Sequence, residues 1–391
     1  MIILKLAYRN LVGAGLRTWL NVGVLSFTYV LIIWHQGIFS GMYRQASREF
    51  IKDEIAGGQY WFEDYDPYDP LTLEKSHGTI PTQLESLMQN KRAAPVLIRQ
   101  GTIYPEGRVQ SVLIKGIDPA QTILDIPTAK LSIAEETTLP VLVGRLMAKK
   151  NSLHIGDYLT IRWRDAKGTF DAADGEIVEI MSTNVPTIDL GQLWVPLKRL
   201  QEMSDLKNEA TIIIVGKDMK QHADLPNWKF KGHDFLLKDI NDVVKSKRIS
   251  GAILYIILLF LAMLAIFDTQ VLSIFRRRKE IGTLMALGMT RSKVIELFTL
   301  EGTLHGILGI AIAAIYGIPV LIFTAHRGIP LPSTAEEYGF ALTTSLFPVY
   351  SAWLVGGTVL LVMVTVTIVS YLPSRKIAQL KPTEALKGKL S

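Results

Sequence analysis

The sequence predicts a membrane α-helical protein with four transmembrane helices and a mixed α+β extracytoplasmic domain inserted between spans one and two. Three observations support this fold class. The apolar residues concentrate in four blocks, residues 44–248 have the composition of a water-soluble domain, and basic residues gather beside the blocks. A helix that crosses a bilayer needs roughly 20 mainly apolar residues, because the hydrocarbon core is about 30 Å thick. All four blocks satisfy this length.

The predicted spans occupy residues 19–42, 249–275, 303–324 and 349–372. Lys5, Arg9 and Arg17 precede the first block, a pattern that signal peptides and membrane anchors share. The block is long for a signal peptide and no small-residue cleavage site follows it, so we expect a retained anchor. The last block is rich in Val and Thr, but its length without a turn signal indicates a span rather than a strand.

Flanking charges predict the orientation of the spans. The N-terminal stretch, the connector between spans two and three and the C-terminal tail are rich in Lys and Arg, whereas the 328–348 loop carries Glu336 and Glu337. Basic loops tend to remain in the cytoplasm. We therefore expect a multi-pass protein of the cell inner (cytoplasmic) membrane with cytoplasmic N and C termini and with residues 44–248 and 328–348 outside.

The charge distribution argues against a nucleic-acid-binding protein. Residues 44–248 hold 27 Lys and Arg and 29 Asp and Glu, so the positive excess lies beside the spans. A nucleic-acid-binding protein would carry that excess on its folded domain, and we expect no nucleic-acid partner. The chain has no cysteine, which excludes disulfides, thiol catalysis and cysteine-based metal sites.

The extracytoplasmic domain has the pattern of a mixed α+β fold. Residues 43–55 continue the first helix outward. Strands are expected at 59–62, 94–104, 109–116, 158–164, 175–181, 192–195 and 210–215, and helices at 82–90, 145–151, 197–203 and 239–247. The histidines lack metal-site spacing and no nucleophile-elbow motif occurs. We therefore expect no catalytic residues and no metal site, and we interpret the domain as a binding or coupling module.

Residues 277–296 predict a helix, a break at Gly288 and a second helix with Thr290 as its N-cap. Four apolar residues of the first helix share one face: Ile281, Leu284, Met285 and Leu287. An apolar face on an otherwise polar cytoplasmic helix must be buried somewhere. Two interpretations stay open from composition alone, a groove of a partner protein and the bilayer surface.

Polar residues inside the predicted spans are the other candidate site. Asp268 lies near the inner end of span two, and Glu301 lies at the inner end of span three with His305 one turn later. Charge in hydrocarbon is costly. These residues either form a cluster that transmits motion of the connector or lie at interface depth, with Asp268 and Glu301 paired to Arg276 or Arg277. We favour the pairing. The outer halves of the spans lack acidic residues, which argues against a proton relay.

Several segments resemble the FtsX-type ABC transporter permease family, whose members include the lipoprotein-releasing permeases LolC and LolE and the macrolide-exporter permease MacB. The more specific matches are Arg-Lys-Glu-Ile-Gly at 278–282 with Ala-Leu-Gly at 286–288, and Pro-Thr-Glu-Ala-Leu at 382–386. Residues 6–18, 301–309 and 373–378 are similar to the N-terminal amphipathic helix, the start of the third span and the C-terminal tail of the family. Residues 141–157 and 192–200 resemble its periplasmic domain.

The resemblance implies three regions: an N-terminal amphipathic helix and first span (1–43), a MacB-like periplasmic core domain (44–248) and an FtsX-like domain (249–391). It also implies a second permease subunit, identical or paralogous, and a cytoplasmic ABC ATPase dimer that carries ATP and Mg, while this chain binds no cofactor itself. Segment 277–296 would be the coupling helix. Its implied contact residues are Arg278, Glu280, Ile281, Gly282, Leu284, Met285, Leu287 and Gly288. Membrane lipid and a periplasmic or outer-membrane partner fit the same arrangement.

The sequence has no G-x-x-x-x-G-K-[ST] motif, so we expect ATP hydrolysis on a separate chain and no enzyme activity here. Four spans without a polar stripe argue against an aqueous pore and favour mechanical work outside the membrane. The leading hypothesis is a permease subunit that releases or extrudes a lipoprotein or other lipophilic substrate. The alternatives are MacB-like efflux of drugs or peptides and FtsX-like regulation of a cell-wall hydrolase. A membrane-anchored enzyme is disfavoured because no catalytic constellation occurs.

Overall fold

The computed structural model describes residues 6–7, 15–132, 138–181, 183, 185–219, 223–330 and 345–377. The chain divides into two compact units. The first combines Met1–Met42, Val243–Pro330 and Leu346–Ser391, and the second combines Tyr43–Asp242 with Leu331–Ser345. The predictions for Glu336, Glu337 and the C-terminal Pro-Thr-Glu-Ala-Leu motif lie outside the described residues, as does most of the N-terminal amphipathic segment.

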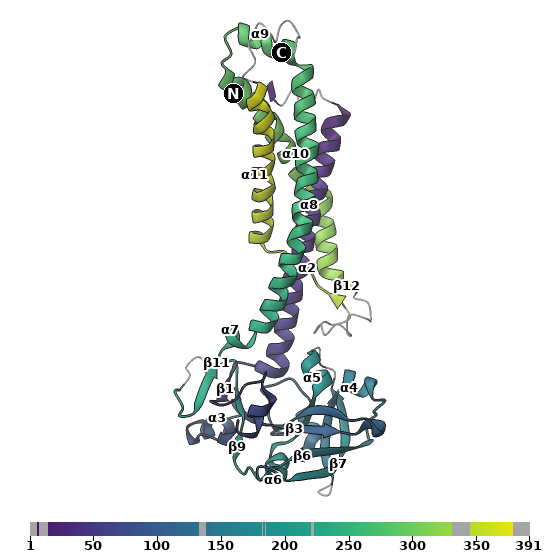
Figure 1. Ribbon diagram of the computed structural model, residues 1–391, viewed down its shortest axis with the longest axis vertical. Coiled ribbons are helices and arrows are strands. Elements are labelled where there is room, and N and C mark those ends of the chain that lie inside the picture. Colours follow the sequence, from purple (N-terminus) through teal and green to yellow (C-terminus); the bar gives the residue numbers. More distant parts are fainter. Residues whose placement is uncertain are drawn as a thin grey trace. The chain divides into compact units, whose positions relative to one another are not determined.

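The first unit is built from four long helices and one short helix (Figure 1). They are α2 (Leu16–Phe50), α8 (Lys238–Arg276), α9 (Arg278–Ala286), α10 (Arg291–Arg327) and α11 (Ala352–Ile377). The four long helices are apolar and long enough to cross a membrane. α2, α8 and α10 each contain a predicted span in full, and α11 contains the predicted fourth span except for its first three residues. The prediction of four long apolar helices is confirmed.

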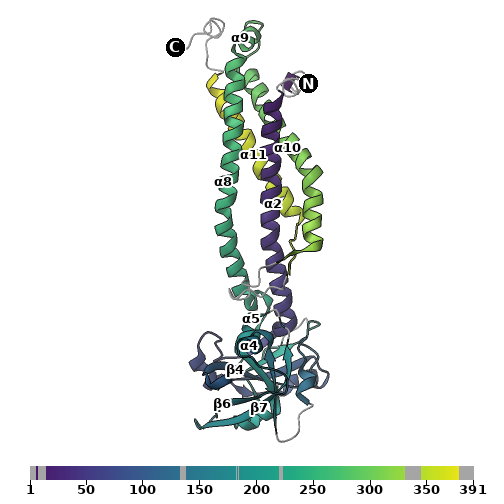
Figure 2. The ribbon, with the colours of Figure 1, turned by 90° about the vertical axis from the view of Figure 1, so that its right-hand side faces the viewer.

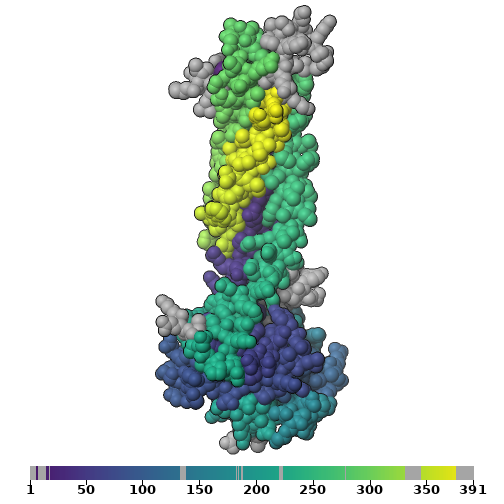
Figure 3. All heavy atoms as spheres, turned by 60° about the vertical axis from the view of Figure 1, so that its left-hand side comes forward, coloured from purple at the N-terminus to yellow at the C-terminus, as the bar shows by residue number. Residues whose placement is uncertain are grey.

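The four long helices share one apolar core. It includes Leu25 and Tyr29 of α2, Ile266 of α8, Ala313 of α10 and Val366 of α11, all nearly inaccessible. α10 and α11 pack along each other (Figures 1 and 2). The yellow α11 lies at the surface in Figure 3, and its exposed residues include Trp353, Leu360 and Ile368. Such outward apolar surface is expected of helices solvated by lipid rather than water.

The second unit is a mixed α/β domain, which confirms the predicted class. Its strands are β1 (Gly58–Phe62), β2 (Gly78–Thr79), β3 (Ala93–Ile103), β4 (Gln110–Ile117), β5 (Leu139–Gly144), β6 (Tyr158–Arg164), β7 (Phe170–Met181), β8 (Gln192–Pro196), β9 (Glu209–Ala210), β10 (Ile212–Val215) and β11 (Trp228–Lys231). Its helical segments are η1 (Ile51–Ile55), η2 (Pro70–Glu74), η3 (Thr82–Leu84), α3 (Glu85–Gln89), η4 (Pro105–Gly107), η5 (Thr128–Ser132), α4 (Arg145–Lys150), α5 (Pro186–Gly191), α6 (Leu197–Met203) and α7 (His233–Leu236). Two further short strands, β12 (Ile329–Pro330) and β13 (Ser345–Leu346), precede α11.

Nine strands form one sheet in the order β11-β1-β10-β3-β4-β8-β5-β7-β6, and β6 pairs back onto β3. The six strands from β3 to β6 in this order therefore close into a barrel, while β10, β1 and β11 extend the sheet beyond it. The pairs β4–β8 and β5–β7 are parallel and the other pairs of this sheet are antiparallel. Closure pairs the edge of β6, which would otherwise be open to other chains, and leaves β11 as the edge strand of the sheet.

Alternating residues of the barrel strands supply its core. β6 alternates strictly, with Leu159, Ile161 and Trp163 buried and the residues between them exposed. Gly101 and Gly175 lie where the walls approach closely, because a Cβ at either position would come within 2.6 Å of an isoleucine or valine side chain. The outer face of the barrel carries the exposed arginines of β6.

A buried ion pair fixes the end of the first helix to this barrel. α2 passes at Phe50 into η1, a π-helical turn, and Glu54 of that turn accepts a 2.6 Å hydrogen bond from Lys115 of β4. The Lys115 ammonium lies 5.1 Å from the centre of the Trp194 ring on β8. Both side chains of the pair are largely buried, so separating them would leave a charge without a partner. We conclude that residues 51–55 move with the barrel as one body.

Candidate functional site

The short helix α9 lies at the end of the helical unit where α2 begins and α11 ends (Figures 1 and 2). It starts at Arg278, whose side chain is outside the described set, and its Glu280 is exposed. A chain reversal follows at Gly288, whose φ of +99° is accessible mainly to glycine. Thr290 takes the predicted N-cap position of α10 with extended backbone, but its side chain makes no capping hydrogen bond.

The apolar face predicted for α9 is divided between two environments. Ile281 is buried against Ile274 of α8 and Val294 and Phe298 of α10, and Met285 packs against the same cluster. Gly282 is buried as well. Leu284 is half-buried, whereas Leu287 is 80% exposed. The expectation that a partner or the bilayer covers the whole face is thus corrected, because the chain itself covers Ile281 and Met285 and leaves the Leu287 end free.

Arg277 joins the three helices that meet at this end. Its Nε donates to Glu280 on α9 at 2.8 Å and its Nη1 donates to Glu301 on α10 at 3.2 Å. The guanidinium also lies 5.3 Å from the centre of the Phe298 ring, a favourable cation–π arrangement. The predicted pairing of Glu301 with Arg276 or Arg277 therefore takes the form of a contact with Arg277, which stands at the junction of α8 and α9.

Asp268 is not part of this cluster. Its side chain is exposed on α8, while Gln270, two residues later, is almost fully buried. The amide nitrogen of Gln270 faces Gly302 of α10, and its amide oxygen has no hydrogen-bond partner within the described part of the chain. Sequence inspection missed Gln270, although an amide in an otherwise apolar span is itself a signal of a polar contact.

A seam of hydroxyl groups continues from Glu301 along α10 and α11. His305 Nδ1 lies 2.8 Å from the main-chain oxygen of Glu301, and Thr303 Oγ1 lies 3.3 Å from Thr367 Oγ1 on α11. Ser370 and Ser374 of α11 are buried and donate to main-chain oxygens one turn earlier. These hydroxyl groups, also absent from the sequence-based candidates, satisfy their donors inside the bundle without a charged partner.

Three glycines let α10 approach its neighbours closely. A Cβ on Gly302 would lie 1.9 Å from Ser370 Oγ, one on Gly306 would lie 2.8 Å from Met363 Sδ, and one on Gly309 would lie 2.9 Å from Leu25 Cβ. The three glycines are spaced i, i+4 and i+7, so they lie on one side of α10. Close backbone packing of this kind stabilises helix association in membranes, where water supplies no hydrophobic driving force.

We expect Gly302→Ala to destabilise the helical unit, because Ser370 must move or α10 and α11 must separate. Overpacking of a well-packed core typically costs about 1–3 kcal/mol. The matched control is Gly356→Ala on α11, where a Cβ meets nothing within 4 Å and the helix gains about 0.5–1 kcal/mol from the lost flexibility of glycine. Thermal unfolding of both variants in detergent micelles measures the difference, and equal melting temperatures would contradict the close approach at Gly302.

No group of three or more His, Asp or Glu among the described residues is placed to hold a metal ion. A short helix is locked to two spanning helices by an arginine and an apolar cluster, and a polar seam continues from that junction into the bundle.

Comparisons with known proteins match this helical unit. Residues 252–382 match the model of the FtsX-like permease C-terminal domain. The chain therefore contains an FtsX-like permease domain. This domain includes most of α8, all of α9 and α10 and the whole of α11, so both the locked helix and the polar seam belong to it.

The chain is also similar in sequence to individual curated proteins. The chain is 23% identical over 197 residues to the macrolide export ATP-binding/permease protein MacB of Wolinella succinogenes, covering 50% of this chain and 27% of that protein. It is 28% identical over 131 residues to an uncharacterized ABC transporter permease of Methanocaldococcus jannaschii, covering 33% of this chain and 30% of that protein. The chain thus spans less than a third of the length of these curated relatives.

One solved structure is similar to part of the chain. It is the extracellular domain of the noncanonic ABC-type transporter YknZ from Gram-positive bacteria, with 12% sequence identity and a TM-score of 0.27 over 42% of this chain and 84% of that chain.

Proposed function

We propose that the chain is the permease subunit of an ABC transporter, which passes ATP-driven motion of a separate cytoplasmic ATPase to its extracytoplasmic domain. The motion would release or extrude a lipoprotein or another lipophilic substrate. The observation that carries this proposal is that α9 is exposed at one end and fixed to the spanning helices on its other side. Its Leu287 end is exposed, while Arg277 and the Ile281 cluster fix its other side to α8 and α10.

Rigid fixation matters because a force on a loosely tethered helix would be absorbed by its linkers. Here a displacement of the Leu287 end must move the ends of α8 and α10 with it. α8 is one helix from Lys238 to Arg276 without an internal proline, and an unbroken helix can carry such a displacement as a rigid element. At the barrel, the Glu54–Lys115 pair holds the end of the first helix in the same rigid manner.

The interior of the helical unit supports mechanical work over conduction through one subunit. Its shared core is apolar, and the polar seam lies at the Arg277 end, where its hydroxyl groups already bond within the bundle. A water-filled path would need polar groups facing a continuous cavity. A lipophilic cargo handled outside the membrane requires no such path.

A second permease subunit is part of the proposal, and Asp268 supports it. α8 is the least buried of the four long helices, and Asp268 shares its exposed face with Phe260 and Leu264. A carboxylate facing lipid is costly, and such residues nearly always face protein or water. We therefore place the face of α8 around Asp268 against the second subunit, either a copy of this chain or a paralogue.

Efflux of drugs or peptides is the second candidate, because the relatives include chains named as macrolide exporters. Regulation of a cell-wall hydrolase would use the same transmission of motion. Depleting the protein and fractionating the cell envelope separates the three. Lipoproteins retained in the inner membrane support release, normal lipoprotein sorting with drug sensitivity supports efflux, and chained cells support hydrolase control. An unchanged envelope, drug response and cell shape would contradict the proposal.

A further inference from the structure

The α/β unit contains a cavity of about 310 Å³ lined by residues of η2, β3 and β6. It lies beside β3, between the part of this strand that pairs with β10 and the part that pairs with β6. β10 pairs with Ala93–Val96 and β6 pairs with Gly101–Ile103, so residues 97–100 between them have neither strand beside them. The η2 segment and the residues of β6 form the walls, and Arg99 lies at the gap itself.

The charges that line this cavity are unbalanced. Three guanidinium groups, those of Arg99, Arg162 and Arg164, face one carboxylate, Glu74. Glu74 is already paired with Arg164 at 2.6 Å. Arg99 donates to the main-chain oxygens of Leu73 and Arg164 at 3.3 and 3.1 Å, and Arg162 lies 4.4 Å from the centre of the Phe170 ring. Within the described residues, neither Arg99 nor Arg162 has a carboxylate partner.

The burial of Arg99 makes this imbalance costly. Its side chain is only 3% exposed, and burial lowers the pKa of its guanidinium from the usual value. Arginine nevertheless stays protonated in proteins. Among the described residues no carboxylate pairs directly with Arg99, although Glu74 and Asp165 lie near enough to stabilise its charge. A buried charge without a direct ion-pair partner is unfavourable, so an anion in the cavity would bring a compensating interaction.

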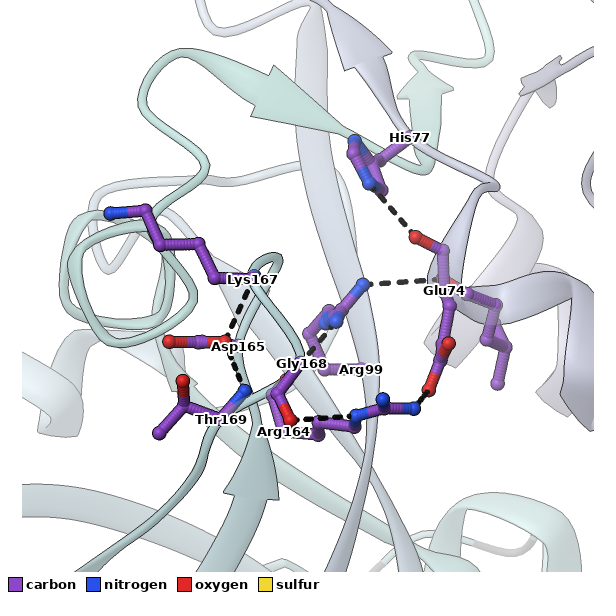
Figure 4. A network of polar contacts seen from close by, with 9 residues as sticks. Glu74, His77, Arg99, Arg164, Asp165, Lys167, Gly168 and Thr169 are labelled. Carbon is purple, nitrogen blue, oxygen red and sulfur yellow. Dashed lines mark hydrogen bonds and ion pairs between the residues drawn. The ribbon is translucent and has the colours of Figure 1, made fainter.

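The rim of the cavity is preorganised (Figure 4). Arg164 is stretched between Glu74 and the main-chain oxygen of Gly168, to which its Nε donates at 3.0 Å. The hairpin that carries Gly168 is closed by the Asp165 carboxylate, which accepts two main-chain N–H groups of the turn. Outside the cavity lining, His77 Nε2 lies 3.0 Å from the main-chain oxygen of Glu74. Residues already held in place lose little entropy when a ligand binds.

We propose that this cavity binds the phosphate group of a small phosphorylated ligand. Arg99 and Arg162 belong to different strands, β3 and β6, so their donors reach the cavity from different elements. A tetrahedral oxyanion has acceptor oxygens in several directions and can accept from both, whereas a planar carboxylate is satisfied by one guanidinium fork. The volume lies at the lower end of small-molecule sites, which span about 300–1,000 Å³. It suits a phosphate with a small attached group.

Titration calorimetry of the full chain in detergent micelles tests this site with inorganic phosphate, phenyl phosphate and succinate as probes. We expect saturable binding of the phosphate probes and weaker binding of succinate. Arg162→Ala should weaken phosphate binding about tenfold through the loss of one charge-assisted contact. The matched control Arg108→Ala removes an exposed arginine of the β3–β4 hairpin, outside the cavity, and should bind like the wild type.

Arg99→Lys provides a second variant, which keeps the charge and removes the guanidinium fork, and it should also weaken binding. Equal affinity for the two phosphate probes would assign the site to free phosphate, and tighter binding of phenyl phosphate would assign it to an organic phosphate. The proposal is overturned if neither probe binds saturably to the wild type, if Arg162→Ala binds phosphate unchanged, or if succinate binds as tightly as phosphate. None of these results depends on the ATPase, so they do not bear on the transport function.

Discussion

Leu287→Asp should abolish co-purification of the ATPase while the permease still inserts and folds. Leu287 follows α9 directly and is 80% exposed. Its side chain therefore contributes little to the core of the chain itself. Placing a carboxylate there would bury a charge in any partner groove that receives the leucine. Truncation or charging of a central apolar anchor typically costs 2 kcal/mol or more, about 30-fold or greater in affinity.

The control for this experiment is Leu71→Asp in η2 of the α/β unit, where the leucine is 85% exposed. Both substitutions put the same charge on an equally accessible surface, and surface changes away from special features alter folding stability by less than about 0.5 kcal/mol. Affinity purification from membranes should recover the ATPase with the Leu71 variant and lose it with the Leu287 variant. Wild-type recovery with Leu287→Asp would show that the ATPase does not grip this end of α9.

Breaking the Arg277–Glu301 pair should give the largest loss of stability in the helical unit. Glu301 is 4% exposed, and Arg277→Met would remove the guanidinium that lies 3.2 Å from its buried carboxylate. Removing one member of a buried pair costs about 3–5 kcal/mol, whereas replacing both members with apolar residues is often neutral. We therefore expect Arg277→Met and Glu301→Met to unfold at lower temperature and the double variant to recover much of the loss.

An exposed ion pair on α10 serves as the control for this comparison. Lys293 and Glu296 on α10 lie 2.8 Å apart, and each side chain is about half exposed. Exposed pairs contribute about 0–1 kcal/mol, so Lys293→Met and Glu296→Met should shift the melting temperature little. A double-mutant cycle in detergent micelles gives both coupling energies. A coupling energy of the Arg277 pair no greater than that of the Lys293 pair would contradict the role of Arg277 as the lock between α8, α9 and α10.

The spans and most strands could be predicted from the sequence because each has a strong periodic or compositional signal. Gln59–Phe62 and Tyr158–Arg164 alternate or carry aromatic and β-branched residues, and both form strands. The strand β5 was missed. Its sequence, Leu139–Gly144, is a continuous apolar run buried along its whole length, and periodicity cannot distinguish such a run from a helical turn. Trp228–Lys231 was missed because it is short and lies at the sheet edge.

The candidate sites were harder to predict because they depend on which elements meet. Helical spacing gave the apolar face of α9, but only the return of α10 decides that Ile281 is covered and Leu287 is free. Gln270 and Ser370 belong to no motif, and their importance comes from the close approach at Gly302. Arg99 interrupts an otherwise apolar buried strand, and that interruption was the available signal of the arginine-lined cavity.

In the proposed topology α9 lies in the cytoplasm and the α/β unit lies on the other side of the membrane. The chain has no cysteine, so a single introduced thiol can be labelled without background. Lys279→Cys in α9 and Glu85→Cys in α3 both place the thiol at an exposed position. In intact spheroplasts, a membrane-impermeant maleimide should label Glu85→Cys at once and should label Lys279→Cys only after the membrane is permeabilised. Labelling of Lys279→Cys from outside an intact membrane would contradict the cytoplasmic position of α9.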